Sequence, residues 1–268
     1  MSENTKALRV RIKSVTSTMQ LTNAMGLVAS SKIRRANMAM QAGRDYAAAL
    51  EETVSVLASD RECLKSPYMQ EREPIKTKII IIAGDRGLAG GYNANIFRLA
   101  AEYPDAEFIP IGKRACERYD KPYNSSENLS FEEAAKLADT LCNEFAQGEY
   151  DRLGIISTRY HSVMSQEAYI KWILPLTKSE SKKDASGMIF EPDCLTVLNN
   201  VAREYVAGII TVCARESFAS EVAARRMAMD SASKNAEQMI SDLQLEYNRA
   251  RQGAITQEIT EIVAGSGD

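Results

Sequence analysis

The sequence predicts an α/β protein in which a long antiparallel coiled coil of N- and C-terminal helices carries a small central α/β domain. Three observations predict this fold. A heptad stripe runs through the first part of the chain, no proline follows Pro192, and between them β-branched runs alternate with helical patterns. We therefore divide the chain into a shaft helix at residues 1–60, an α/β domain at residues 74–192 and a second shaft helix at residues 195–268.

The N-terminal helix is predicted by apolar or small residues that recur at alternating steps of four and three. This spacing places them along one face of a helix, as in a coiled coil. Pro67 is the first proline, so nothing before it interrupts the helix. The stripe consists of Leu8, Ile12, Val15, Met19, Thr22, Gly26, Ala29, Ile33, Ala36, Met40, Gly43, Ala47, Leu50, Val54 and Leu57.

The C-terminal helix is predicted by a different spacing. Its small and apolar residues recur at steps of eleven, which suits a helix that stays nearly straight. Two long helices at opposite ends of one chain are expected to pack against each other antiparallel. The two series are Ala228, Met239 and Ala250, and Ala232, Leu243 and Ala254, with Ala236 and Tyr247 between them.

The middle of the chain has the pattern of a Rossmann-like domain. Its first strand is the run TKIIIIA, which is largely apolar and β-branched, so this strand is expected to be covered on both faces. Strands that alternate with helices predict a largely parallel sheet. Strands are expected at residues 77–83, 107–111, 152–158 and 167–176, helices at 93–102 and 131–147, and an exposed loop at 179–187.

Composition and charge narrow the class of protein. A content of 45% hydrophobic and 26% charged residues is typical of a globular protein, and no apolar run is long enough to span a membrane. The first residues lack the apolar core of a signal peptide, which predicts a cytoplasmic protein. Residues 1–35 hold seven lysines and arginines against one glutamate, a net charge of +6, which fits either a solvated helix face or an acidic partner.

The cysteines and the glycine-rich loop at residues 84–93 offer little chemistry. The five cysteines form no Cys-x-x-Cys pair and are expected to be free thiols in or near cores. The loop, GDRGLAGGYN, follows a strand but lacks the ending of a P-loop, which leaves a tight turn, a protein contact or a phosphate cradle open. His161 is the only histidine, and no G-x-S-x-G elbow occurs, so no active site is predicted.

Five segments resemble a known family. They are residues 11–36 (RIKSVTSTMQLTNAMGLVASSKIRRA), 85–91 (DRGLAGG), 191–193 (EPD), and the C-terminal pair 216–229 (ESFASEVAARRMAM) and 247–263 (YNRARQGAITQEITEIV). Here the chain is similar to the gamma subunit of F-type rotary ATP synthases of the bacterial type, and the resemblance covers essentially its whole length. Asn23 and Gly26 depart from the family pattern. The dicysteine insertion of the chloroplast version is absent, which argues against a thiol switch.

The resemblance implies a central rotor shaft that couples ion-driven rotation of a membrane c-ring to ATP synthesis at catalytic sites on αβ subunits. It implies a subunit that is not itself catalytic, has no cofactor or metal, and binds neither nucleic acid nor a small molecule directly. The implied partners are the α and β subunits, with one copy of this chain per three αβ pairs, the epsilon subunit and the c-ring. The implied location is the cytoplasmic face of the cell membrane, as a peripheral component of the complex.

The resemblance also implies contact residues. Candidates for contacts with the β-subunit catch loops are Arg225, Gln252, Thr256 and Glu258, with Met25 packed nearby. Glu191 and Phe190 would lie near the c-ring. Solvated helix charges and coiled-coil packing are the alternative interpretations of these residues.

Two rival functions stay open at this point. A structural coiled-coil tethering protein with a globular hinge would explain the two helical arms, and it predicts self-dimerisation or salt-sensitive DNA binding. A small nucleotide-binding enzyme built on the central domain predicts ligand binding by residues 74–192 alone.

Overall fold

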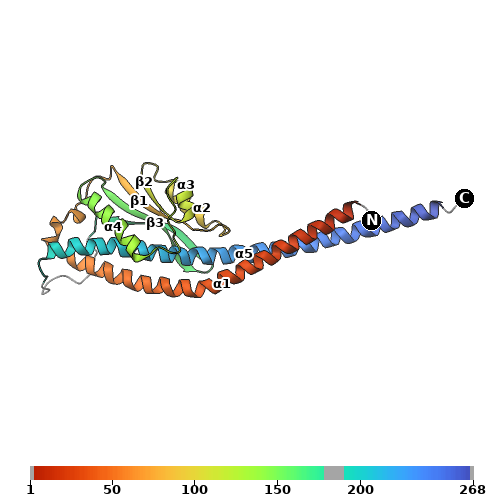
Figure 1. Cartoon of the computed structure of the whole chain (residues 1–268), viewed down its shortest axis with the longest axis horizontal. Helices are drawn as coiled ribbons and strands as arrows, with labels where there is room; N and C mark the ends of the chain where they lie inside the picture. The colour runs from red at the N-terminus through yellow and green to blue at the C-terminus, as the bar shows by residue number, and fades with distance from the viewer. Residues whose placement is uncertain (1–2, 178–189, 266–268) are drawn as a thin grey trace. The chain divides into compact units, whose positions relative to one another are not determined.

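The computed structural model describes residues 3–177 and 190–265, so the loop predicted at 179–187 lies outside the described residues. The chain divides into two compact units. The α/β unit is Ser31–Ala224, and the coil unit combines Met1–Ser30 with Arg225–Asp268. Helices α1 (Glu3–Leu57) and α5 (Cys194–Gly265) each contribute one segment to each unit (Figure 1).

The α/β unit is built on a four-stranded mixed sheet with the order β2-β1-β3-β4. Strand β1 pairs in parallel with both β2 and β3, and β3 pairs antiparallel with β4. The strands are β1 (Thr77–Ile82), β2 (Glu107–Ile111), β3 (Arg152–Ser162) and β4 (Ser165–Leu174). All four predicted strands are therefore confirmed, but β3 runs further than expected because its polar end forms an exposed hairpin with β4.

Helices cover both faces of the sheet, as Figure 1 shows. Ile80 and Ile82 of β1 pack on α4 and α5, whereas Ile79 and Ile81 pack on α2 and α3. The central strand is thus buried on both sides, as its apolar run predicted. The covering helices are α2 (Tyr92–Ala100), α3 (Lys113–Arg118) and α4 (Phe131–Ala146), of which α3 was not predicted. Two short 3-10 helices, η1 (Cys63–Lys65) and η2 (Pro67–Met69), follow α1.

Helices α1 and α5 lie antiparallel within the α/β unit. A side chain on Gly43 of α1 would meet Val212 of α5 at 3.5 Å, and one on Gly208 of α5 would meet Leu50 of α1. The stripe residues Ala36 and Met40 are buried, and they pack with Ala219 of α5. Small residues on both helices therefore let the two backbones approach closely.

The coil unit contains the other antiparallel segments of the same helices. The hydroxyl oxygens of Thr22 and Ser233 lie 2.7 Å apart, and a side chain on Gly26 would meet Met229 at 3.6 Å. Throughout α1, every stripe residue is at least partly buried, which confirms the predicted heptad face.

The eleven-residue spacing predicted for α5 is wrong at one position. Met239 is 44% exposed, and Ile240 takes its place on the half-buried face. With Ile240 included, the partly buried positions follow steps of three and four, the spacing of a left-handed coiled coil. Ala236 and Leu243, which flank Ile240 at these steps, are buried. Packing against α1 selects this face.

The prediction that all five cysteines are free is also wrong. Cys63 at the start of η1 and Cys194 at the start of α5 form a disulfide, while Cys116, Cys142 and Cys213 are buried thiols. The two bonded residues are 131 positions apart in sequence, so only the folded chain shows that they meet. In the part of the chain that the structure describes, no helix combines the length and apolarity needed to cross a membrane.

Candidate functional site

The glycine-rich loop at residues 84–93 is held by contacts within the α/β unit. The carboxylate of Asp85 accepts hydrogen bonds from the backbone N–H groups of Lys113, Ser126 and Glu127, at 2.9 to 3.2 Å, and from the Ser125 hydroxyl at 2.8 Å. The Gly84 N–H donates to Asn93 Oδ1 at 2.9 Å. These contacts favour the tight-turn interpretation of the loop over a phosphate cradle.

Asp85 is accordingly stabilised in its charged form. Burial raises the pKa of this carboxyl, but the hydrogen bonds from Glu127, Lys113, Ser125 and Ser126 outweigh burial and lower the pKa below its ordinary value of 3.8. A carboxyl with a lowered folded-state pKa stabilises the fold above its unfolded pKa, and this stabilisation is lost as the pH falls through the folded pKa.

We expect Asp85→Asn to lower the free energy of unfolding at pH 7 by about 2–3 kcal/mol, because amide hydrogens would face backbone donors. The difference from the unsubstituted chain should shrink as the pH falls below 3.8. Urea unfolding of both chains at a series of pH values from neutral to acidic measures this difference in the free energy of unfolding. Asp105→Asn, on an exposed turn, is the control and should change stability little. A difference that stays constant with pH would contradict the assignment.

A row of polar side chains on α5 joins this helix to the end of the sheet. The Ser217 hydroxyl accepts from the Thr158 N–H at 3.2 Å, and the Ser220 hydroxyl donates to the Thr158 carbonyl at 3.3 Å. The Ser217 carbonyl accepts from the Tyr92 hydroxyl at 3.0 Å. Glu221 is 2% exposed and lies so close to Gly84 that a Cβ there would sit 2.8 Å from its carboxyl carbon. Much of the motif at residues 216–229 therefore packs against the sheet of the same chain, a role that its sequence pattern did not predict.

Glu216 belongs to the same row and links three elements. Its carboxylate accepts from Arg44 Nη2 of α1 at 2.5 Å and from the Tyr160 N–H of β3 at 3.0 Å. Arg44 Nη2 also donates to the Tyr160 carbonyl at 2.6 Å. These three residues line a groove of about 510 Å³ between α1, the β3–β4 hairpin and α5. Lys171, also in this groove, pairs with Glu51, so the acidic groups of the groove have basic partners within the chain.

The contact residues implied by the resemblance fall in two places. In the coil unit, Met25 and Arg225 are half-buried on their helices, and Gln252 and Thr256 are exposed. The Thr256 hydroxyl donates to the Gln252 carbonyl at 3.0 Å, so it can only accept from a partner without giving up this bond. The side chain of Glu258 lies outside the described residues, although its backbone is part of α5.

The last turns of α5 present apolar side chains to solvent. In the antiparallel register set by Thr22 and Ser233, the start of α1 lies opposite residue 252. The turns beyond it extend past the beginning of α1 (Figure 1). Ile255, Ile259 and Ile262 are 46%, 56% and 71% exposed. At steps of four and three these side chains share one face of α5 and form an exposed apolar stripe.

The other two implied residues lie beside the start of α5, in the α/β unit. Phe190 is half-buried and packs on the core cluster that α4 and α5 share, whereas Glu191 is exposed. Of this pair, only Glu191 presents most of its side chain for an external contact.

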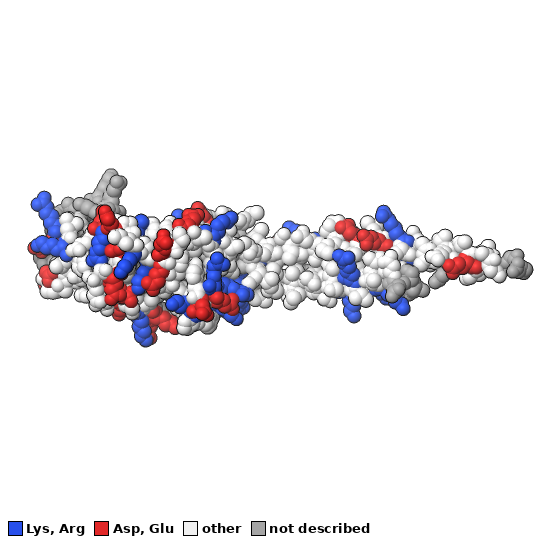
Figure 2. Space-filling view, turned by 90° about the horizontal axis from the view of Figure 1, so that it is seen from above, with Lys and Arg blue, Asp and Glu red and all other residues white. Residues whose placement is uncertain are grey.

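The described residues offer no cluster of three or more histidine, cysteine or acidic side chains that would hold a metal ion. His161 lies on the exposed hairpin, with its Nε2 3.1 Å from Glu167. Figure 2 shows acidic and basic side chains intermixed on the visible face of the α/β unit.

Comparison with known proteins decides the family. The profile of the family described as ATP synthase matches residues 4–267. The ATP synthase gamma chain of Geotalea daltonii is 37% identical over 278 residues, which cover 97% of each chain. The chain belongs to the ATP synthase gamma chain family. The gamma chain of Ruminococcus albus is 38% identical with 98% of each chain covered, and the sodium ion specific gamma chain of Acetobacterium woodii is 36% identical with 99% covered.

Solved structures share the fold of this chain. A chain of the Euglena gracilis mitochondrial ATP synthase, solved with OSCP, F1 and the c-ring, superposes with a TM-score of 0.68 at 18% identity, covering 98% of this chain and 93% of that one. A chain of the Tetrahymena thermophila central stalk and c-ring has a TM-score of 0.60 at 22% identity, covering 80% and 99%. The predicted fold class is thereby confirmed.

Proposed function

We propose that this chain is the central rotor shaft of a rotary ATP synthase. It couples ion-driven rotation of a membrane c-ring to the conformational changes that make ATP at the αβ catalytic sites, and the chain itself is not catalytic. Its match to gamma chains along almost the whole length carries the proposal. A relative named as sodium ion specific and a relative without an ion in its name are about equally similar to this chain. Sequence similarity therefore does not identify which ion drives the rotation.

The long helices suit the transmission of torque. Helix α5 continues for 72 residues and α1 for 55. Stripes of small residues hold the two together in each unit, and paired helices resist bending better than a single one. The buried row from Glu216 to Glu221 fixes α5 to the sheet, so that a force on the α/β unit passes directly to the helix.

We assign the contacts of the shaft accordingly. Arg225, Gln252, Thr256 and Glu258 face the catch loops of the β subunits, with Met25 nearby, and the exposed apolar turns that follow Gln252 rotate inside the αβ ring. Glu191 and Phe190 lie toward the c-ring. The epsilon subunit binds the α/β unit, and the assembly lies at the cytoplasmic face of the cell membrane as a peripheral complex.

Co-expression with cognate α and β subunits tests this function. We expect a complex with one copy of this chain per three αβ pairs by native mass, and an ATPase activity that falls several-fold when the chain is truncated after Gln252. Lys136→Ala, on the exposed face of α4, is the control and should leave assembly and activity unchanged. A chain that elutes alone or as a homodimer, and that leaves αβ activity unchanged, would favour the tethering function.

A further inference from the structure

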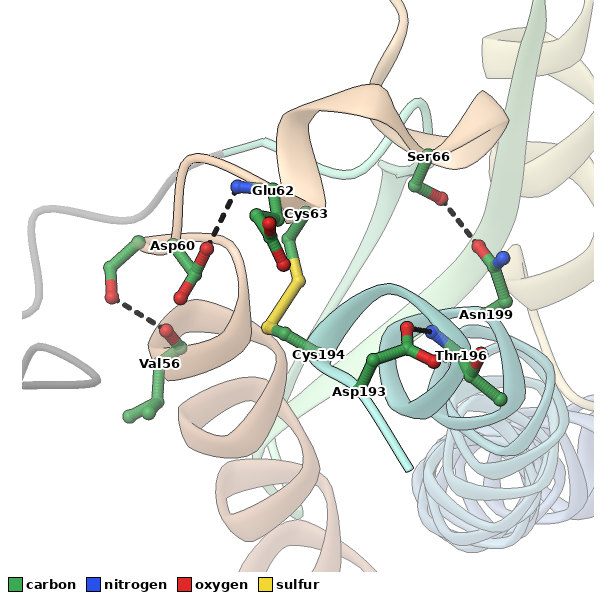
Figure 3. Close-up of a disulfide and its surroundings, with 10 residues drawn as sticks. Val56, Asp60, Glu62, Cys63, Ser66, Asp193, Cys194, Thr196 and Asn199 are labelled. Atoms are coloured by element: carbon green, nitrogen blue, oxygen red, sulfur yellow. Dashed lines mark hydrogen bonds between the residues drawn. A yellow bond between two sulfur atoms is a disulfide. The ribbon is translucent and has the colours of Figure 1, made fainter. Parts of the chain in front are cut away.

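The absence of the chloroplast dicysteine insertion argued against a thiol switch, but the structure pairs two other cysteines. We propose that Cys63 and Cys194 are a reversible redox clamp that fastens the end of α1 to the beginning of α5. Figure 3 shows the bond, which joins the turn after α1 to the first residue of α5. The segment between the two cysteines contains the whole sheet. The clamp thus closes the α/β unit at the two points where its sheet segment is connected to the long helices.

The surrounding fold brings the two cysteines together independently of the bond. The Ser66 hydroxyl, three residues after Cys63, donates to Asn199 Oδ1 of α5 at 2.7 Å. Asp193 fixes the first turn of α5 by accepting from the Thr196 N–H at 2.8 Å. The Cα atoms of the two cysteines are 6.1 Å apart, within the usual range of about 4.4–6.8 Å for disulfides. Reduced thiols would therefore remain adjacent and ready to re-form the bond.

The two bonded cysteines are both buried but differ in their place in the fold. Cys63 is fully buried among core residues that include Leu57 and Leu198, whereas Cys194 is 5% exposed. Cys194 also occupies the first turn of a long helix, where the helix dipole stabilises a thiolate. We therefore assign the first attack on a reagent to Cys194, from its place in the first turn of α5.

The exchange chemistry follows from this difference. With a low-molecular-weight disulfide as oxidant, the Cys194 thiolate attacks one reagent sulfur and releases the first reagent thiolate. The Cys63 thiolate then attacks Cys194 Sγ, forms the internal bond and releases the second. Two protein thiols are oxidised, one reagent disulfide is reduced to two thiols, and the two protein protons go to the released thiolates. Reduction by a dithiol runs the same steps backwards.

The reversible use of the bond rests on the cytoplasmic placement proposed above. Disulfides in that compartment are usually transient or redox-sensing, because thiols there are kept reduced. The bond would then form under oxidising conditions and stiffen the base of the α/β unit. Cys116, Cys142 and Cys213, which the structure shows as separate buried thiols, would not take part.

The full-length chain tests the clamp without partner subunits, so its failure is distinct from failure of the rotor function. After incubation with oxidised glutathione, denaturation and alkylation, mass spectrometry should find three alkylated thiols and one linked peptide pair, and five alkylated thiols after dithiothreitol. The Tm of the α/β transition should fall by about 5–15 °C on reduction, because a disulfide that closes a long loop restricts the unfolded chain.

Matched variants complete the test. Cys194→Ser should have a Tm that does not respond to dithiothreitol and is close to that of the reduced unsubstituted chain. Cys116→Ala, which removes another buried cysteine, should keep the full response. Two results would overturn the proposal. One is five alkylated thiols after oxidation, and the other is an unsubstituted chain that has the same Tm with the disulfide formed and with it reduced. The unsubstituted chain alone decides it if Cys194→Ser does not fold.

Discussion

Gly112→Ala is expected to destabilise the α/β unit by about 3–5 kcal/mol or to prevent its folding. Gly112 lies between β2 and α3 with a φ of +95°, a conformation that strains any side chain. A Cβ at this position would lie 1.9 Å from the Ala83 carbonyl oxygen. That oxygen belongs to the backbone at the end of the central strand, so the clash cannot be relieved by a rotamer change. Chemical denaturation monitored by circular dichroism measures the loss.

Gly148→Ala is the matched control for this substitution. Gly148 also has a positive φ, +78°, but a Cβ there would meet only the tip of Arg72, at 3.6 Å. It should therefore show the conformational cost alone, about 1 kcal/mol. Equal losses at the two glycines would mean that the close approach at Ala83 contributes nothing.

Glu216→Ala is the second large effect that we expect, a loss of about 2–4 kcal/mol. The substitution removes the acceptor for Arg44 and leaves the Tyr160 N–H without its carboxylate partner. Because Glu216 is 7% exposed, water replaces these contacts poorly. Thermal and urea unfolding of the full-length chain measure the change.

Two further variants isolate the Arg44–Glu216 interaction. Arg215→Ala, at the exposed neighbouring position on α5, should change stability by less than about 0.5 kcal/mol. In a double-mutant cycle, Arg44→Ala and Glu216→Ala should lose less together than the sum of their separate losses, because each removes the same ion pair. Additive losses would show that the two side chains do not stabilise each other.

Local patterns predicted most of the secondary structure. The β1 run, TKIIIIA, could be recognised as a doubly covered strand because four consecutive isoleucines and Ala83 leave neither face polar over residues 79–83. The α1 stripe could be recognised because residues spaced by three and four positions lie on one face of an α-helix. Helix α3 was missed because its six residues, KRACER, are too few for a periodic pattern.

The contacts of the candidate site residues were harder to predict from the sequence than the helices and strands. The residues of the C-terminal motif could be matched to a family. Their positions in the sequence, however, do not show which residue each side chain contacts. Ser217, Ser220 and Glu221 turn inward toward Thr158 and Gly84, and a sequence-level signal existed in their shared helix face. The exposure of Gln252 and Thr256, by contrast, leaves them available for the contacts proposed for them.

The sequence by itself determined the two long helices, the four strands and the family, because each depends on neighbours in the chain or on matched segments. Only the tertiary structure decided that Ile240 rather than Met239 faces the half-buried side of α5, that Cys63 meets Cys194, and that Glu216 binds Arg44. These facts depend on the register of α1 against α5. That register is set by the summed packing of many small side chains, and no single segment of the sequence contains it.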